Sequence, residues 1–235
     1  MDFSGWEKLS LVDFDDNLTT TLFMAGCPFR CPYCHNSDLV LRPNEAPKIP
    51  WEEILEYLKK RRGVLDAVCV SGGEPTLMND LKEKLSDIKS LGYKVKLDTN
   101  GVHPNILREL ADAKLVDYFA MDIKNSPKKY GMTIGLPNFD IAPILSSIDF
   151  LLHSGVDYEF RTTLVEEFHD EEDIREIKEL IAGAKRYYLQ RYIDNENCIV
   201  HGLHEVSVGK ALGFLDILKP SIGAVALRGY DTDRE

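Results

Sequence analysis

The chain has 235 residues, 44% of them hydrophobic, which is enough to bury one sizeable core. Its formal net charge of −11 argues against a nucleic-acid partner, because proteins that bind a phosphate backbone concentrate Lys and Arg on one face. No apolar run reaches the roughly 20 residues of a membrane span and the N-terminus lacks a signal-peptide layout, so we expect a cytoplasmic protein with no membrane contact. The five cysteines, three of them between positions 27 and 34, fit a reducing compartment better than a disulfide framework.

Apolar, β-branched runs alternate with segments of helical period from Leu18 to the C-terminus. This alternation is typical of repeated βα units on a parallel sheet. The predicted strands are Leu18–Met24, Ala67–Ser71, Val95–Asp98, Tyr118–Ile123, Tyr158–Leu164, Tyr187–Arg191 and a short last one near Gly223–Leu227. The predicted helices are Trp51–Arg62, Asn79–Leu91, Pro104–Ala113, Ile141–His153, Glu171–Ala182 and one near Val206–Leu215. Pro104 suits the first turn of its helix, and Asp170 suits an N-cap.

Nothing in the sequence resembles a linker or an internal repeat, so residues 1–235 are expected to form a single domain. Six βα units are too few for a closed eight-stranded barrel. We therefore expect an α/β fold in which a curved parallel sheet forms a partial (β/α)6 barrel. The functional groups of such a sheet lie at the carboxyl ends of its strands. The polar end Asp231–Glu235 is expected to fray.

Three cysteines follow the first predicted strand with the spacing C-x3-C-x2-C, at Cys27, Cys31 and Cys34. Three thiolates can bind a four-iron cluster and leave one iron open. A closed structural zinc site needs four ligands, and His35 is badly placed for chelation because it adjoins Cys34. A zinc site completed by a distant residue such as Cys69 is the alternative that the triplet alone leaves open.

Polar motifs also follow the next three predicted strands. SGGEP (Ser71–Pro75) follows the second strand, DTNG (Asp98–Gly101) ends the third, and Asp122-Ile123-Lys124 ends the fourth. Glycines allow a backbone to approach a ligand closely, although a Gly-Gly turn is weak evidence by itself. Because parallel strands end at one edge, these motifs and the cysteines are expected to converge.

With these motifs the chain resembles the radical S-adenosylmethionine (SAM) enzymes, and more narrowly the activating enzymes that install a glycyl radical. The resemblance covers nearly the whole chain. It implies that Cys27, Cys31 and Cys34 bind a 4Fe–4S cluster whose open iron is chelated by the methionine moiety of SAM. The reduced cluster would cleave SAM to a 5′-deoxyadenosyl radical, which takes hydrogen from a glycine of a partner enzyme.

The resemblance also assigns cofactor contacts. Tyr33 would lie near the adenine of SAM, although packing of the loop explains an aromatic residue there equally well. Ser71, Gly72, Gly73 and Glu74 would contact the methionine ammonium group, with Glu74 as its charged partner. His35 and Asn36 complete the CPYCHN string, and their side chains can simply cap the loop.

Further assignments concern the later strand ends. The DTNG motif, including Asn100, and the Asp122-x-Lys124 motif match glycyl-radical activators, and Lys124 would face the SAM carboxylate. Arg161 would reach the SAM carboxylate or ribose, with a structural ion pair as the alternative, and Gln190 would make a polar contact. A monovalent cation could lie beside SAM, with ordinary strand-end hydrogen bonding as the alternative. Its proposed ligands are Asp98, Thr99, Asp122 and the carbonyl of Ala120.

Three other features are interpreted as structural. Cys69, in the middle of a predicted strand, is expected to be a buried small residue. Cys198, His201 and His204 have C-x2-H-x2-H spacing but no partner motif, so they are not predicted to bind metal. The acidic run Glu166–Glu172 is expected to be a solvated face at a helix N-terminus, although it could meet a partner protein.

The expected partner is a glycyl-radical enzyme, with an electron donor such as flavodoxin or ferredoxin. CPYCHN, LQRY (189–192) and VALRG (225–229) resemble the activators of anaerobic ribonucleoside-triphosphate reductase most. A pyruvate formate-lyase type activator is one alternative. A small-molecule radical SAM enzyme of the 7-carboxy-7-deazaguanine synthase type is a second, and a non-catalytic zinc-binding module is a third that leaves SGGEP and DTNG unexplained.

Overall fold

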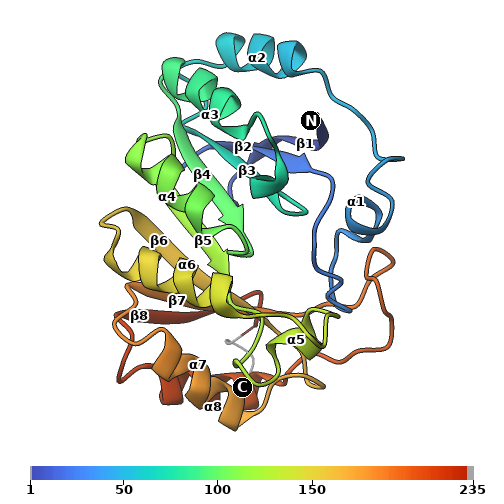
Figure 1. Ribbon diagram of the computed structural model, residues 1–235, viewed down its shortest axis with the longest axis vertical. Coiled ribbons are helices and arrows are strands. Elements are labelled where there is room, and N and C mark those ends of the chain that lie inside the picture. The colour runs from blue at the N-terminus through green and yellow to red at the C-terminus, as the bar shows by residue number, and fades with distance from the viewer. Residues whose placement is uncertain (1, 232–235) are drawn as a thin grey trace.

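The computed structural model describes residues 2–231. They form one sheet in which eight strands lie side by side in chain order (Figure 1). The strands are β1 (Phe3–Ser10), β2 (Thr19–Met24), β3 (Ala67–Gly72), β4 (Lys94–Thr99), β5 (Tyr118–Asp122), β6 (Asp157–Leu164), β7 (Arg186–Arg191) and β8 (Ala224–Arg228). The α-helices are α1 (Ser37–Leu41), α2 (Trp51–Lys60), α3 (Leu81–Ser90), α4 (Pro104–Asp112), α5 (Tyr130–Thr133), α6 (Ala142–His153), α7 (Glu171–Leu180) and α8 (Val208–Leu218), and a 3₁₀ turn covers Pro75–Leu77.

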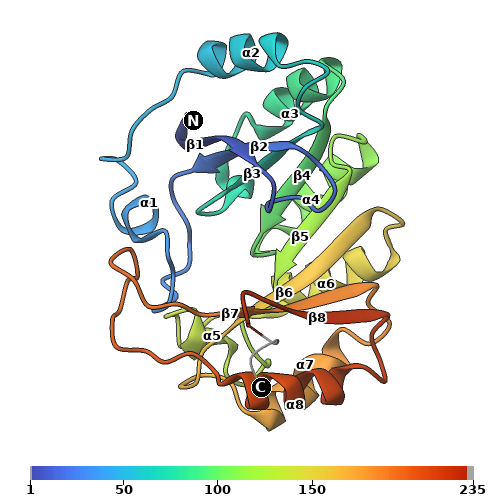
Figure 2. The ribbon, with the colours of Figure 1, turned by 180° about the vertical axis from the view of Figure 1, so that it is seen from behind.

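The sheet is parallel from β2 to β8, and only β1 runs antiparallel to its neighbour. A crossover helix between parallel strands brings each strand back beside the previous one in the same direction. The sheet curves, and in the described part of the chain no pairing joins β8 to β1, so the barrel stays open (Figures 1 and 2). Every loop that follows a strand from β2 onward therefore starts at the same edge.

The predicted partial (β/α)6 barrel is confirmed. Six units of strand and helix run from β2 to α8, and β8 follows them. The predicted bounds are close to those of the structure, with the largest difference at α8, which ends at Leu218 rather than Leu215. Beyond Asp231, the predicted polar tail lies outside the described residues.

Three elements were not predicted, namely β1, α1 and α5. The edge strand β1 has only one neighbouring strand, apart from an isolated bridge between Phe3 and Ile49, and most of its residues are partly or fully exposed. It therefore lacks an apolar strand pattern. The helices α1 and α5 have 5 and 4 residues. A segment of that length is too short to show a helical period.

Apolar strand residues form the core. Val68, Val70, Leu97 and Phe119 are fully buried, as expected for parallel strands that are covered on both faces. Polar groups are also buried on these strands, and Lys96 and Glu159 are 4% and 2% exposed. Among the described residues, no helix has the length and apolar character needed to cross a membrane.

The predicted N-cap of α7 is confirmed, and its contribution to stability can be tested. Asp170 caps this helix: its side chain accepts a hydrogen bond from the Asp173 amide at 3.0 Å, and the Asp173 side chain accepts one in return from the Asp170 amide. Replacing Asp170 with Ala should lower the free energy of unfolding by ~1 kcal/mol, because the Asp173 amide in the first turn of the helix loses its partner. Urea unfolding followed by circular dichroism measures the change. Glu171→Ala, one position further and not a cap, is the control, and an equal loss in both variants would contradict the capping account.

Candidate active site

A cleft lies at the carboxyl edge of the sheet, where the loops after β2 to β5 meet side chains of β6 and β7. It collects most of the residues predicted from the sequence. These are Cys27, Cys31, Tyr33, Cys34, Ser71, Gly72, Gly73, Asp98, Thr99, Asn100, Asp122, Lys124, Arg161 and Gln190. Two predicted residues, Glu74 and Ala120, do not line it.

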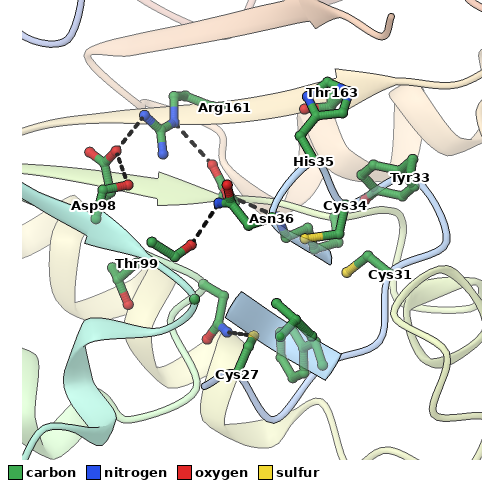
Figure 3. Close-up of a pocket in the computed structure, with 18 of the residues that line it drawn as sticks. Cys27, Cys31, Tyr33, Cys34, His35, Asn36, Asp98, Thr99, Arg161 and Thr163 are labelled. Atoms are coloured by element: carbon green, nitrogen blue, oxygen red, sulfur yellow. Dashed lines mark hydrogen bonds and ion pairs between the residues drawn. The ribbon is translucent and has the colours of Figure 1, made fainter. Parts of the chain in front are cut away.

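The cysteine loop is held in place by its own backbone and by distant segments. The Arg30 amide donates to the Ile134 carbonyl at 2.8 Å, and the Val200 amide donates to the Pro32 carbonyl at 2.8 Å. The Arg30 guanidinium donates to the carbonyl of Cys27 at 2.6 Å. The three cysteines thus sit on a fixed loop, with their sulfur atoms pointing toward the same part of the cleft (Figure 3).

All three cysteines are free thiols, which fits a cluster with thiolate ligands. Burial raises the pKa of Cys27 to about 11 and that of Cys31 to about 12. Metal binding at these sulfurs must therefore release protons. In residues 2–231, no three His, Cys, Asp or Glu side chains are grouped around a position for a single metal ion. A cluster differs from such a site because each thiolate binds a different iron, so the donor set suits the cluster better than zinc.

The SGGEP loop packs against the start of the cysteine loop through backbone hydrogen bonds. The amide of Gly73 donates to the Met24 carbonyl at 2.7 Å, and the amide of Glu74 donates to the Gly26 carbonyl at 2.8 Å. A Cβ atom on Gly73 would lie 2.0 Å from that Gly26 oxygen. Gly72 has a φ of +114°, which side chains rarely adopt. The two glycines are therefore required for this close approach.

The Glu74 carboxylate is fully buried behind the cleft. Its Oε1 accepts hydrogen bonds from the Thr76 amide (3.1 Å), the Thr76 hydroxyl (2.6 Å) and the Thr99 hydroxyl (2.9 Å), and its Oε2 accepts one from the Asn100 amide (2.7 Å). Burial raises the pKa of Glu74, and these donors oppose the shift. The structure therefore does not bring Glu74 to the cleft as a charged ligand, and it uses Glu74 to join the SGGEP and DTNG loops.

Oppositely charged side chains pair at the cleft, where Figure 3 shows Arg161 beside Asp98. Arg161 bridges two carboxylates, with Nη1 3.4 Å from Asp98 and Nε 3.0 Å from Asp122. Lys124 lies 2.9 Å from Asp122, and Lys96 lies 3.5 Å from Asp98. Burial alone would raise the pKa of Asp122, but the Lys124 and Arg161 charges outweigh it and lower the pKa to about 2. The pKa of Lys124 is raised, because Asp122 and other negative groups outweigh its burial.

The proposed cation ligands are only partly assembled. Asp98, Thr99 and Asp122 line the cleft, and Ala120 does not. Both carboxylates already face Arg161, and the Thr99 hydroxyl donates to Glu74. One oxygen, Asp98 Oδ1, is buried without a hydrogen bond among the described residues, although Lys96 is 3.5 Å away.

Tyr33, His35 and Asn36 of the CPYCHN string line one wall of the cleft. Tyr33 is buried beside the rings of Phe168 and Tyr192, and its hydroxyl has no hydrogen-bond partner in the described chain. His35 stacks on Tyr192 at 5.7 Å and contacts the Ile193 carbonyl at 2.8 Å through Nε2. The Asn36 amide donates to the Gly72 carbonyl at 2.9 Å. His35 and Asn36 thus tie the cysteine loop to neighbouring segments.

Five lining residues were not predicted as metal or cofactor contacts, namely Phe29, His35, Asn36, Val40 and Thr163. Thr163 could have been found, since it lies two positions after Arg161 on β6 and so faces the same side. The residues discounted from the sequence stay apart: Cys69 is fully buried on β3, His201 pairs with Asp194, and His204 pairs with Glu167.

Comparisons with known proteins agree with this site. A family model described as the Radical SAM superfamily matches residues 21–181. Among solved structures, Streptococcus suis SuiB bound to S-adenosylmethionine gives a TM-score of 0.68 at 15% identity over 89% of this chain, which spans only 52% of SuiB. A domain of a pyruvate-formate lyase-activating enzyme from Bacteroides vulgatus gives 0.58 at 20% identity, over 70% of this chain and 99% of that domain. These structural likenesses show the fold.

Sequence relatives are more specific. A Methanocaldococcus jannaschii protein, provisionally named as a glycyl-radical enzyme activating enzyme, is 35% identical over 80% of this chain and 79% of its own length. The pyruvate formate-lyase-activating enzyme of Staphylococcus aureus is 32% identical over 57% of this chain and 58% of its own. The chain is thus a radical SAM enzyme. Within that superfamily it belongs to the glycyl-radical enzyme activating enzymes.

Because Gly73 lies so close to the Gly26 carbonyl, a larger residue at position 73 should destabilise the protein. Gly73→Ala should lower the free energy of unfolding by roughly 1–3 kcal/mol, because the added methyl group overlaps a backbone carbonyl that cannot turn away. It should also reduce the iron retained per chain after anaerobic reconstitution, since the cysteine loop must move. Gly209→Ala is the control, because a Cβ there meets nothing within 4 Å. Iron retention equal to that of the unmodified protein would contradict the account.

The low pKa of Asp122 predicts acid sensitivity of the metal-free protein. Its folded pKa of about 2 lies below the ordinary value of 3.8, so this ion pair stabilises the fold above about pH 4 and is lost as the pH falls toward 2. The loss amounts to roughly 2 kcal/mol. Urea unfolding across this pH range measures it. The Asp122→Asn variant should lose less stability over the same range, and identical pH slopes would show that the pair is not responsible.

Proposed function

We propose that this chain uses a 4Fe–4S cluster and SAM to install a radical on a glycine of a partner enzyme. The observation that carries the proposal is the convergence of three free thiols, the glycine loop and two cationic side chains in one cleft. The relative with 35% identity over most of both chains supports the same reaction class.

Cys27, Cys31 and Cys34 would hold the cluster, which supplies the electron for reductive cleavage of SAM. The Ser71–Gly73 backbone would lie against the methionine moiety, where the missing side chains leave room. Lys124 and Arg161 would attract the SAM carboxylate, and both are only partly exposed. Tyr33 and Gln190 would line the remaining side. The Glu74 carboxylate has no direct part in this proposal, because its oxygens face other partners.

A monovalent cation would compete with Arg161. Binding at Asp98, Thr99, Ala120 and Asp122 requires Arg161 to turn away from at least one carboxylate. Contacts of its guanidinium with SAM would offset that loss. The buried oxygen of Asp98 that lacks a hydrogen bond is the feature that favours such a cation.

For the partner, we propose an anaerobic ribonucleoside-triphosphate reductase, with flavodoxin or ferredoxin as the class of electron donor. Support comes from the CPYCHN, LQRY and VALRG strings. Gln190 of LQRY lines the cleft, whereas Arg228 of VALRG pairs with Glu159 and does not. Pyruvate formate-lyase is the second candidate, favoured by the relative that is named for its activation.

Cysteine substitution tests the cluster assignment. Cys31→Ala should remain folded but lose the cluster, and with it the cleavage of SAM to 5′-deoxyadenosine and methionine under a reductant. Iron, sulfide and product analysis measure this. Cys69→Ala is the control, because Cys69 is buried outside the cleft and is the fourth ligand of the alternative zinc site. SAM cleavage by Cys31→Ala, or loss of bound metal in Cys69→Ala, would overturn the assignment.

The partner is identified by mixing the reduced protein and SAM with candidate enzymes. Electron paramagnetic resonance should show a doublet from a glycyl radical with anaerobic ribonucleoside-triphosphate reductase. A doublet with pyruvate formate-lyase alone would replace the proposed partner. No doublet with either enzyme, despite SAM cleavage, would reject both.

A further inference from the structure

The side chain of Asn100 points at the sulfur of a proposed cluster ligand. Its amide nitrogen Nδ2 lies 3.6 Å from Cys27 Sγ, the contact drawn at Cys27 in Figure 3. Asn100 is only 6% exposed, so water competes little for this hydrogen bond. Within residues 2–231, neither Cys31 nor Cys34 receives a side-chain hydrogen bond at its sulfur.

The orientation of the Asn100 amide follows from a second contact. The Val102 amide donates to Asn100 Oδ1 at 3.0 Å. A backbone amide can only donate, so the atom it meets must be the side-chain oxygen. The opposite end of the group, which faces Cys27, is therefore the nitrogen that carries the hydrogens.

The backbone of Asn100 is fixed by Glu74. The Asn100 amide donates to Glu74 Oε2 at 2.7 Å, and the Glu74 amide donates to the carbonyl of Gly26, the residue before Cys27. Asn100 and Cys27 are 73 positions apart in sequence, yet both are held through this one buried residue. The donor and the sulfur thus keep their separation without relying on the cluster.

We propose that Asn100 raises the reduction potential of the cluster by donating this hydrogen bond to Cys27, which rests on the function proposed above. On reduction the cluster takes one electron from the reductant, and its thiolate sulfurs become more negative. A hydrogen-bond donor at a sulfur stabilises the reduced state more than the oxidised state. No bond to Asn100 forms or breaks.

The buried Glu74 carboxylate acts in the opposite direction. Its negative charge, close to Cys27, favours the less negative, oxidised cluster. Glu74, which joins the SGGEP and DTNG loops, therefore brings a negative charge near the cluster. The hydrogen bond from the Asn100 amide offsets the effect of that charge on the reduction potential. Asn100 is in this sense a positioning residue that acts on the cluster through Cys27.

The test is a potentiometric titration of the reconstituted full chain without SAM, followed by electron paramagnetic resonance. In Asn100→Ser the hydroxyl can still accept from Val102, but it is too short to reach Cys27. At the midpoint potential of the unmodified protein, the ratio of reduced to oxidised cluster should fall roughly fivefold to tenfold, and tenfold is about 59 mV for one electron. Asn17→Ser, which removes an amide bonded to the Asp15 carbonyl outside the cleft, should leave the ratio unchanged.

An unchanged potential in Asn100→Ser with normal iron and sulfide content would overturn the inference, as would an equal shift in Asn17→Ser. Asn100→Asp keeps the size of the side chain and the contact to Val102 but puts an oxygen toward the sulfur. Asn100→Asp should also lower the reduction potential at alkaline pH. If Asn100→Ser binds no cluster, the potential of Asn100→Asp is the test of the inference. If neither variant binds a cluster, the amide is needed for assembly, which contradicts a role in the potential. An unmodified protein that binds no cluster would instead refute the proposed function.

Discussion

The parallel order of β2 to β8 is the constraint on which the site depends. Each strand lies beside the one before it in sequence, so the loop after every strand opens at one edge of the sheet. The cysteines, the glycine loop and the charged strand ends belong to distant parts of the chain, and this order alone brings them together. In residues 2–231 no pairing joins β8 to β1, so the sheet stays open between its two edge strands.

Two kinds of polar interaction hold the site together, namely hydrogen bonds between the loops and ion pairs between buried side chains. Backbone hydrogen bonds and glycines hold the cysteine loop against the SGGEP loop. The cysteine side chains are not needed for this contact, so their sulfur atoms stay available for metal. Across the floor, Arg161, Lys96 and Lys124 neutralise Asp98 and Asp122, so the buried charges are paired. A negatively charged ligand group entering the cleft would meet cations that are already fixed in place by the carboxylates.

Much of this arrangement follows from sequence patterns, because periodicity marks buried strands and the motifs fall at their ends. The α/β class, the six βα units and the convergence of four motifs were predicted. The role of Glu74 was not, since a motif does not show whether its carboxylate turns toward the ligand or back toward Thr99 and Asn100. The contact between Asn100 and Cys27 could not be predicted either, because it depends on the angle between two loops.

The proposed function requires that Cys27, Cys31 and Cys34 bind a four-iron cluster and leave one iron for SAM. Mössbauer spectroscopy of protein reconstituted with isotopically enriched iron tests this most directly. On addition of SAM, the signal of one iron should change while those of the other three stay the same. Four equivalent irons that do not respond to SAM would contradict the account.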